Sequence, residues 1–430
     1  MPDLLSVAAA RETVLSVVKP LTATTLPLDK SIHLVLAEEI HSTGDSPPFS
    51  KAMVDGYAVG DANLGEGEIL QVTQEIFAGA VSHTPLLAGQ CARIMTGAPI
   101  PTGTAAVVMH ERTRPVDLTA NAEKLANASF SGDQPHTIQL LESTKAGQNI
   151  LKKGAAISAG QSLLQPGQPL SPACIGLLAD QGITTVAVHP RPTVAILSTG
   201  DELVPIGQEP VGAQIRNSNS HLLQAAIHIA GGEPRVIGIA RDNLPELRQK
   251  ITLGLNADIL LLSGGVSAGL LDLVPQVLQE LGVRKVFHKI RLKPGKPLWF
   301  GVYEPENQIA PEITRTRTLV FGLPGNPVSS GVCCELFVKL AIAALRGLYV
   351  EKAISTQPAL LANDFIHRGD RPTYFPARLE KRGAHIWAMP LKSAGSADLL
   401  AYALAEGLIA FPAGDKEYFP GDNVEVLPLF

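Results

Sequence analysis

The sequence predicts an α/β protein with additional β domains, and three observations lead to this prediction. Between residues 191 and 348, short apolar runs alternate with amphipathic helical patterns, which is typical of βαβ units and a parallel sheet. Residues 51–145 carry short β-like runs separated by Gly/Pro turns. Residues 349–430 return to the same kind of pattern, so we expect a small β barrel or sandwich at the C-terminus.

Composition limits the class of protein. The chain has 430 residues, and 35 Lys plus Arg against 40 Asp plus Glu give a net charge of −5. That length suggests about three domains, and the mild acidity argues against a nucleic-acid-binding protein, which would present a basic face. Hydrophobic residues make up 45% of the chain, which is enough to build packed cores.

Neither a membrane span nor a secreted protein is expected. The two most apolar runs either end in glycines or carry Lys339 and Arg346, and neither reaches the ~18 unbroken apolar residues of a span. The N-terminus lacks the basic region of a signal peptide. The four cysteines form no CxxC pattern, so a reduced, cytoplasmic protein is the natural interpretation.

The first 190 residues contain two predicted helices. Apolar residues recur at helical spacing over residues 4–19, and Pro20 ends that pattern. Pro47-Pro48 excludes regular structure from the loop that follows. A second helix is expected to begin at Ser171-Pro172 and to stop at Gly182.

From residue 191 onward, strands and helices alternate. The predicted strands are, in order, 193–199, 235–240, 258–265, 283–290 and 318–323. The predicted helices are 218–232, 243–255, 270–282 and 328–347. Ligands of open parallel sheets bind at the carboxyl ends of the strands. Here five successive loops at that edge carry Gly, Ser, acidic or Lys residues: "STGDEL", "RDN", "SGGVSAGLLD", "KIRLKPGKP" and "GLPGNPVSSG".

The residue types in these loops suit a phosphorylated ligand with a divalent metal. Gly-rich turns that lead into helices expose backbone N–H groups to anions, and Lys289, Lys293 and Lys296 add positive charge. Carboxylates supply hard oxygen ligands for Mg²⁺; they are Asp201, Glu202, Asp242 and Asp272. Neither G-x-G-x-x-G nor G-x-x-x-x-G-K-[ST] occurs, so neither a Rossmann dinucleotide site nor a P-loop is supported.

Each of these signals has an ordinary structural explanation. A single Gly-rich loop such as "GLPGNP" is usually a tight turn, and Glu202 alone would be a helix N-terminal charge. His221 and His228 suit surface or core positions, and Cys333-Cys334 suits a packed helix. Five such loops at one sheet edge are much harder to explain by turns alone.

Eight motifs, in order along nearly the whole chain, resemble those of the molybdopterin molybdenumtransferases, the MoeA family that includes the gephyrin E domain. They are "PPFSKAMVDGYAV", "IMTGAPIPTGTAAVVMHE", "GQNILKKGAAISAGQ", "AILSTGDELV", "IRNSNSHLL", "SGGVSAGLLD", "LKPGKPLWFG" and "GLPGNPVSS". The resemblance implies four domains: a discontinuous elongated linker domain (1–50 and 146–190), an inserted β domain (51–145), a molybdopterin-binding α/β domain (191–348) and a C-terminal β barrel (349–430).

The resemblance also implies a reaction and partners. Members of the family form elongated homodimers and insert molybdate into adenylated molybdopterin, with Mg²⁺ present and with release of AMP. The substrate site would lie in a dimer cleft, and other cofactor-biosynthesis enzymes are further expected partners. The reaction needs no strong nucleophile from the protein, because the dithiolene sulfurs of the substrate bind the metal, and this agrees with the absence of a Cys cluster.

Matching the family's motifs residue by residue assigns the site. The catalytic residues implied are Asp55, Thr96, Glu202, Asp242 and Asp272, of which Asp55, Asp242 and Asp272 would bind the metal. The residues implied to bind the substrates are Ser198, Gly200, Ser263, Gly264, Gly265, Ser267, Lys289, Lys293, Lys296, Gly325, Asn326, Ser329 and Ser396.

The chain departs from the family's pattern at several positions. Ser50 and Ala52 replace the signature's Asp and Ser, and His110 stands where Gln is common. Pro376 replaces an arginine of the C-terminal domain, which leaves Arg371 and Arg378 as alternative substitutes.

Three other functions remain alternatives at this point. Two are enzymes built on the same α/β domain: an adenylyltransferase that makes the adenylated intermediate, and a pyridine-nucleotide hydrolase of the competence-damage type. The flanking β domains and the "DGYA" loop disfavour both. A gephyrin-like scaffold is disfavoured because neither a long linker nor a fused N-terminal domain is recognisable. Molybdate and tungstate, which are nearly equal in size and charge, are not distinguished.

Overall fold

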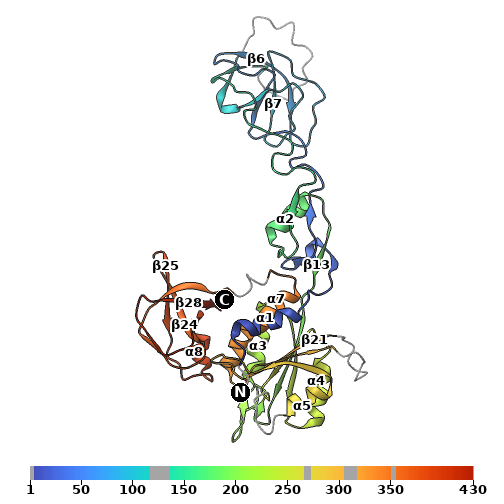
Figure 1. Cartoon of the computed structure of the whole chain (residues 1–430). Coiled ribbons are helices and arrows are strands. Elements are labelled where there is room, and N and C mark those ends of the chain that lie inside the picture. The colour runs from blue at the N-terminus through green and yellow to red at the C-terminus, as the bar shows by residue number, and fades with distance from the viewer. Residues whose placement is uncertain (1–3, 117–135, 266–272, 305–316, 350–354, 430) are drawn as a thin grey trace. The chain divides into compact units, whose positions relative to one another are not determined.

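The computed structural model describes residues 4–116, 136–265, 273–304, 317–349 and 355–429. The chain divides into two compact units (Figure 1). One consists of Met1–Glu38, Pro166–Ile175 and Thr185–Phe430, and the other of Glu39–Gln165 and Gly176–Thr184. The segments expected to form a linker domain are thus shared between the two units, and the four-domain division stays a prediction.

A six-stranded sheet forms the centre of the larger unit, with the strand order β17-β14-β18-β21-β20-β19. Its strands are β14 (Thr193–Thr199), β17 (Glu233–Ala240), β18 (Ile259–Ser263), β19 (Val283–His288), β20 (Trp299–Tyr303) and β21 (Thr318–Leu323). The first four strands in this order are parallel, as predicted. Strands β14, β18 and β21 are buried on both faces, which explains their continuous apolar sequences.

Strand β20 departs from the predicted all-parallel sheet. It pairs antiparallel with both β19 and β21. Residues 289–298, which connect β19 to β20, are too few for the helical crossover that a parallel pair needs, so the chain turns back on itself. The sequence predicts the loop at 289–298 but no strand over Trp299–Tyr303, so β20 is an addition to the predicted sheet.

The sheet has a topological switch point between β14 and β18. The chain runs from β14 outward to β17 and then returns past β14 to form β18 on its other side. In open α/β sheets, the loops diverge at such a point and leave a crevice at the carboxyl ends of the strands.

Helices cover both faces of this sheet (Figure 1). On one face lie α1 (Val7–Val17), α3 (Ser218–Ile229), α6 (Pro327–Cys333), the π-helical turn η4 (Cys334–Val338) and α7 (Lys339–Leu345). On the other lie α4 (Leu244–Gly254) and α5 (Leu273–Glu280). Asn217 and Asn243 cap α3 and α4 by accepting from the backbone N–H groups of Ser220 and Glu246.

The continuous helix Pro327–Leu345 is long and apolar enough to cross a membrane by length and composition alone. It is 94% buried inside the protein, where it packs in the core beneath the sheet. Its apolar sequence is therefore accounted for by the core of the α/β domain.

A closed barrel follows the α/β domain and confirms the predicted C-terminal barrel. Its order is β22-β25-β24-β26-β28, formed by β22 (Gln357–Leu361), β24 (Thr373–Arg382), β25 (His385–Pro390), β26 (Gly407–Phe411) and β28 (Asn423–Pro428). Beside it lie β23 (Phe365–His367), β27 (Lys416–Tyr418) and α8 (Leu399–Ala403). Phe365 stacks on Phe411 at a ring separation of 4.3 Å in the barrel core.

The larger unit also contains a small sheet, β1-β13-β2, built from β1 (Thr24–Pro27), β2 (Val35–Leu36) and β13 (Thr185–His189), with the 3-10 turn η1 (Leu28–Lys30) between β1 and β2. A short ladder pairs β15 (Leu203–Val204) with β16 (Ile215–Arg216).

Helix α2 (Pro172–Asp180) begins and ends as predicted, because the Ser171 hydroxyl accepts from the N–H of Cys174 and Gly182 adopts a positive φ of 70°.

The second unit carries the predicted inserted β domain. Its six-stranded sheet has the order β8-β5-β7-β6-β10-β9, with β5 (Gly56–Val59), β6 (Ile69–Ile76), β7 (Gln90–Ile94), β8 (Ala106–Met109), β9 (Thr113–Pro115) and β10 (Thr137–Leu140), and with η2 (His110–Arg112) after β8. Two short ladders pair the beginning of the segment 39–165 with its end. They are β3 (Ile40–His41) with β12 (Ser162–Leu164), and β4 (Lys51–Ala52) with β11 (Ile150–Leu151).

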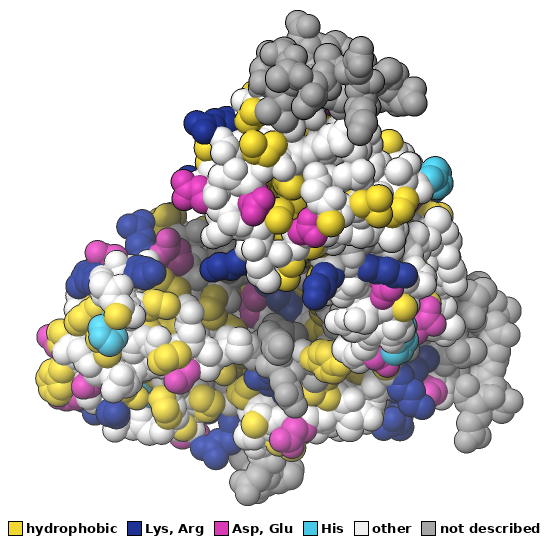
Figure 2. Space-filling view, turned by 90° about the horizontal axis from the view of Figure 1, so that it is seen from above, with side chains coloured by type: hydrophobic (Ala, Val, Ile, Leu, Met, Phe, Trp, Pro, Cys, Tyr) yellow, Lys and Arg dark blue, Asp and Glu magenta, His cyan; other side chains and the backbone are white. Residues whose placement is uncertain are grey.

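The face of the molecule in Figure 2 carries a mixed surface. Lys and Arg side chains are interspersed there with Asp and Glu and with small apolar groups over the described residues. Mixed charges of this kind agree with the near balance of 35 basic and 40 acidic residues in the sequence.

Candidate functional site

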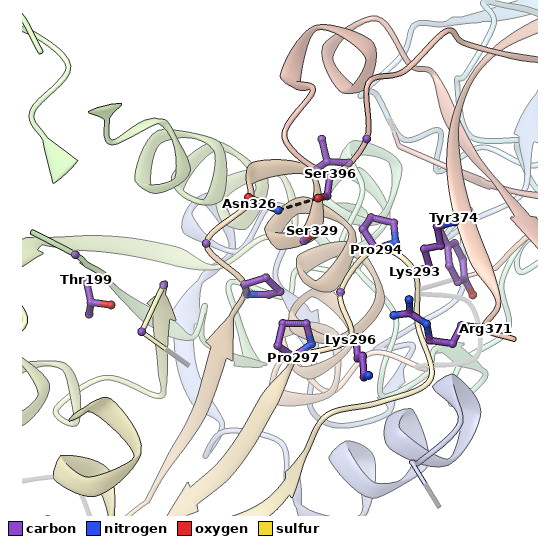
Figure 3. Close-up of a pocket in the computed structure, with 18 of the residues that line it drawn as sticks. Thr199, Lys293, Pro294, Lys296, Pro297, Asn326, Ser329, Arg371, Tyr374 and Ser396 are labelled. Carbon is purple, nitrogen blue, oxygen red and sulfur yellow. Dashed lines mark hydrogen bonds between the residues drawn. The ribbon is translucent and has the colours of Figure 1, made fainter. Parts of the chain in front are cut away.

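A cavity of about 720 Å³ lies at the carboxyl edge of the sheet in the larger unit. The loops that follow β14, β18 and β21 line it on one side, through Thr199-Gly200, Gly264-Gly265 and 324–326. The C-terminal domain lines it on the other, through Arg371, Tyr374 and Ser396 among others. Figure 3 shows Thr199 at one end of this cavity and Lys293, Arg371 and Tyr374 at the opposite end.

Two glycines allow the strand ends to approach closely. Gly264 and Gly265 both adopt positive φ, 93° and 62°. A Cβ on Gly264 would lie 2.6 Å from the carbonyl oxygen of Thr199, and one on Gly265 would lie 2.5 Å from the Thr199 hydroxyl. Both the backbone conformation and the available space therefore require glycine at these positions.

Lys293 and Lys296 reach the cavity from the loop between β19 and β20. Gly295 between them has a φ of 120°, and a Cβ there would lie 2.7 Å from the Cys333 sulfur. The buried helix under the loop therefore fixes how closely the loop approaches the core. The two ammonium groups bring positive charge to this end of the cavity.

Strand β24 and the residues before it hold the lysine loop by backbone hydrogen bonds. The N–H of Lys293 donates to the carbonyl of Pro372 at 2.9 Å, and the N–H of Tyr374 donates to the carbonyl of Lys293 at 2.8 Å. The Arg371 guanidinium donates to the carbonyl of Leu292 at 3.1 Å. The C-terminal domain therefore fixes the position of the Lys293 backbone.

A buried histidine supports the same segment. His367 is 3% exposed, and its ring contacts the Gly414 carbonyl through Nδ1 at 2.7 Å and the Thr373 hydroxyl through Nε2 at 2.8 Å. A carbonyl can only accept, so Nδ1–H donates to Gly414, and Nε2 and the Thr373 hydroxyl share the second hydrogen bond. Thr373 lines the cavity, so this pair anchors the cavity wall to the barrel core.

The loop after β21 is joined to the C-terminal domain at the cavity rim. The side-chain amide of Asn326 donates to the hydroxyl of Ser396 at 2.8 Å (Figure 3). The N–H of Val328 donates to the carbonyl of Ser396 at 3.1 Å. Ser329, in the first turn of α6, also lines the cavity.

Two exposed carboxylates, Glu202 and Asp242, line the cavity among the loops after β14 and β17. The Glu202 carboxylate folds over Gly200, 2.5–2.8 Å from where a Cβ would stand. Arg241 steadies the loop by donating to the carbonyls of Asp201 at 2.7 Å and Leu203 at 3.1 Å. Within the described residues, no cluster of three or more His, Cys, Asp or Glu side chains could hold a metal alone.

Comparisons with known proteins agree with this architecture. Family models for the MoeA N-terminal region (domains I and II), a probable molybdopterin-binding domain and the MoeA C-terminal region (domain IV) match residues 5–182, 195–344 and 358–429. A molybdopterin molybdenumtransferase of Nostoc sp. is 34% identical over 92% of this chain and 86% of its own length. The chain belongs to the molybdopterin molybdenumtransferase family.

Other members of the family match nearly end to end. The molybdopterin molybdenumtransferase of Synechocystis sp. is 30% identical, and the match covers 97% of this chain and 98% of that protein. A crystal structure of a molybdopterin biosynthesis MoeA protein from Pyrococcus horikosii superimposes with a TM-score of 0.79 at 30% identity, with both chains fully covered.

Most of the residues that the family resemblance assigns to the larger unit lie together in the cavity. They are Gly200, Glu202, Asp242, Gly264, Gly265, Lys293, Lys296, Gly325, Asn326, Ser329 and Ser396. Asp272 and Ser267 lie outside the described residues.

Three of the described residues assigned to the larger unit do not line the cavity. Ser198 is buried and donates to the side-chain oxygen of Asn217 at 3.1 Å. Ser263 is buried and accepts from the amide of Asn219 at 2.9 Å. Lys289 adopts a positive φ of 68° in the turn after β19 and is also absent from the lining. The two serines are in register on β14 and β18, so both side chains point to the same face of the sheet, where Asn217 and Asn219 at the start of α3 bind them.

Asp55 and Thr96 belong to the second unit and contact each other. One Asp55 carboxylate oxygen accepts from the Thr96 N–H at 2.6 Å and from the Thr96 hydroxyl at 2.8 Å. These two hydrogen bonds, the backbone one first, stabilise the carboxylate and lower the pKa of Asp55 below its usual value.

The structure also distinguishes the two arginines that the sequence left open. Arg371 lines the main cavity. Arg378 lines a separate cavity of about 300 Å³ on the barrel, beside Trp387 and Met389. Arg371 precedes β24 and contacts the lysine loop through the Leu292 carbonyl, whereas Arg378 lies within β24 on the barrel.

Sequence reasoning missed Thr199, Tyr374 and Asn219. Thr199 lies between two residues that were assigned, and it lines the cavity. Asn219 donates to Ser263 and, at 2.7 Å, to the Gly325 carbonyl, so it joins the loops after β18 and β21. The "IRNSNSHLL" motif contained the signal for Asn219, but no role had been assigned to it.

Proposed function

We propose that this protein inserts molybdate into adenylated molybdopterin and releases AMP, with Mg²⁺ present, in the cavity at the carboxyl edge of the sheet. Its relatives from Nostoc and Synechocystis are named molybdopterin molybdenumtransferases. In this reaction two Mo–S bonds form as two molybdate oxygens leave as water, using two thiol protons and two solvent protons. One water is consumed as the diphosphate P–O bond breaks, and molybdenum stays hexavalent throughout.

One observation carries the proposal: the cavity has groups of opposite charge in different parts of its lining. Lys293, Lys296 and Arg371 gather on the side of the C-terminal domain, opposite Thr199 (Figure 3). Glu202 and Asp242 lie on the loops of the sheet. A tetrahedral dianion needs hydrogen-bond donors and positive charge, which the cationic end supplies together with the hydroxyls of Ser329 and Ser396.

Glu202 and Asp242 are the described residues that would hold Mg²⁺. Their oxygens are the hard ligands that this ion prefers, and Mg²⁺ commonly uses one or two protein carboxylates together with substrate phosphates. Both side chains are exposed to the cavity, so they fit that role. Bound Mg²⁺ would neutralise charge on the diphosphate, while the chain's own residues bind and orient the two substrates.

A homodimer belongs to the same proposal. Asp55 lies in the second compact unit and is not among the residues that line the cavity, so we infer that it serves the site of a second copy of the chain. Sedimentation at micromolar concentration tests this: a species of about 90 kDa, twice the 45.4 kDa of one chain, is expected. A species of 45.4 kDa alone would contradict the dimer.

AMP release tests the proposed reaction. The purified protein is supplied with adenylated molybdopterin and Mg²⁺, with and without molybdate, and AMP is quantified. We expect AMP to appear only when molybdate is present. AMP release that does not depend on molybdate would indicate a nucleotide hydrolase instead, and tight peptide binding with no AMP release would indicate a scaffold.

A further inference from the structure

The hydroxyl of Thr199 is a buried polar group without a hydrogen-bond partner. The residue is 3% exposed. Among the described residues, its Oγ1 is the one buried side-chain nitrogen or oxygen that lacks a partner. Burying a hydroxyl without replacing its hydrogen bonds to water costs free energy of folding, so such a group needs an explanation.

The position of this hydroxyl points to a ligand. Thr199 is the last residue of β14, at the switch point of the sheet, and it lines the cavity. Figure 3 shows its oxygen at the end of the cavity away from Lys293 and Arg371. The neighbouring hydroxyls of Ser198 and Ser263 are both bonded within the protein, so the missing partner is particular to Thr199.

The surroundings of Thr199 favour an acceptor oxygen on the ligand. Gly264 and Gly265 turn over the hydroxyl with positive φ, and successive amides in such turns form concave anion sites. No described residue accepts from the N–H of Gly265 or of Gly325 in the next loop. These amides can only donate, and a threonine hydroxyl beside them can donate to the same oxygen.

We propose that Thr199 anchors the substrate by donating its hydroxyl hydrogen bond to a phosphoryl oxygen of the diphosphate. The proposal rests on the proposed function, because that function supplies a diphosphate-linked substrate. Thr199 is a binding residue, and it forms or breaks no covalent bond. Its hydroxyl stays without a partner in the ligand-free protein and is satisfied when the diphosphate binds.

Stability and affinity should therefore change in opposite senses when the hydroxyl is removed. Thr199→Val keeps the shape and deletes only the unpartnered group, so the ligand-free protein should melt at the same or a higher temperature than wild type. The same variant should bind inorganic pyrophosphate with Mg²⁺ about tenfold more weakly, the effect of losing one hydrogen bond to a charged group. Thr199→Ser keeps a hydroxyl and should bind nearly as well as wild type.

Thr193, at the other end of β14, is the matched control. Its hydroxyl donates to the Asp258 carboxylate at 2.7 Å and accepts from the Asp258 N–H at 3.1 Å. Thr193→Val should lower the melting temperature and leave pyrophosphate affinity unchanged. The two substitutions are chemically identical, so they separate a structural hydroxyl from a ligand-binding one.

The binding experiment is titration calorimetry of each variant with inorganic pyrophosphate and, separately, with adenosine. Weaker pyrophosphate binding by Thr199→Val, with adenosine binding unchanged, supports the proposal. Unchanged pyrophosphate affinity overturns it, as would a melting temperature lowered as much as in Thr193→Val, since the hydroxyl would then have a protein partner. Absence of AMP release by the wild-type protein would contradict the proposed function. The ratio of pyrophosphate affinities between wild type and Thr199→Val tests the role of Thr199 alone.

Discussion

The side-chain amide of Asn326 donates a hydrogen bond to the hydroxyl of Ser396 at 2.8 Å, and this bond joins the loop after β21 to the C-terminal domain. Both residues also line the cavity. Removing either partner should loosen the same rim, so their effects on turnover should overlap.

A double-mutant cycle tests this relationship. Asn326→Ala and Ser396→Ala are each expected to lower kcat/KM about fivefold, the effect of one hydrogen bond of about 1 kcal/mol. The double variant should be little worse than either single one, because each substitution already breaks the bond. Fully multiplicative losses would mean that the two side chains act independently.

Lys293 should determine the molybdate requirement. Lys293→Ala removes a charge-assisted contact and is expected to raise the KM for molybdate about tenfold. The affinity for adenylated molybdopterin should fall less, because several loops share its contacts. Lys285→Ala, an exposed lysine on β19, is the control. An unchanged molybdate dependence in Lys293→Ala would leave that lysine as a phosphate contact or a surface charge.

Arg371 is expected to replace the arginine that Pro376 displaces. Arg371→Ala should lower kcat/KM about tenfold or more, since it removes a cation from the cavity. Arg378→Ala should have little effect, because that side chain lines the separate barrel cavity. Steady-state kinetics of both variants checks this, and a larger loss in Arg378→Ala would reverse the assignment.

Asp242 should affect the Mg²⁺ requirement without affecting the fold. Asp242→Asn keeps the size of a loop side chain but weakens a carboxylate ligand, so the Mg²⁺ concentration for half-maximal AMP release should rise about tenfold. Circular dichroism should match wild type, because the residue lies in an exposed loop. Wild-type Mg²⁺ dependence in this variant would remove Asp242 from the metal site.

The pKa of Asp55 should rise when Thr96 loses its hydroxyl. Both hydrogen bonds from Thr96 favour the charged carboxylate and lower its pKa. Thr96→Val removes one of them, so the acid limb of the rate profile should move to higher pH. The stabilisation associated with this lowered pKa is present above the unfolded-state value and is lost as the pH falls through the folded-state value. Carbon-13 NMR titration of the Asp55 carboxyl measures the shift directly, and an unmoved pKa would contradict the role of the hydroxyl.

Much of the fold could be predicted because its signals are local. Buried parallel strands such as 193–199 are continuous apolar runs, and the helix at Pro172 has a capping serine before it and a glycine after it. Strand β20 is absent from the predicted strands although Trp299–Tyr303 is a fully buried run, and its antiparallel direction follows from the short connection to β19, which no local pattern records.

The candidate site was predictable to the level of loops but not of every side chain. Ser198 and Ser263 lie in the predicted loops or next to them. Strand alternation places both side chains on one face of the sheet, however, where they form internal hydrogen bonds instead of lining the cavity. Thr199 was missed because a threonine between conspicuous glycines and acids carries no pattern of its own. Its importance appears only when burial and hydrogen bonding are known together.

In the proposed reaction, one cavity couples molybdenum insertion to the release of AMP. The most direct measurement is to follow AMP and pterin-bound molybdenum in the same reaction of the wild-type protein with adenylated molybdopterin, molybdate and Mg²⁺. We expect the two products to appear in equal amounts and at the same rate. AMP formed without molybdenum on the pterin, or molybdenum incorporated without AMP, would contradict it.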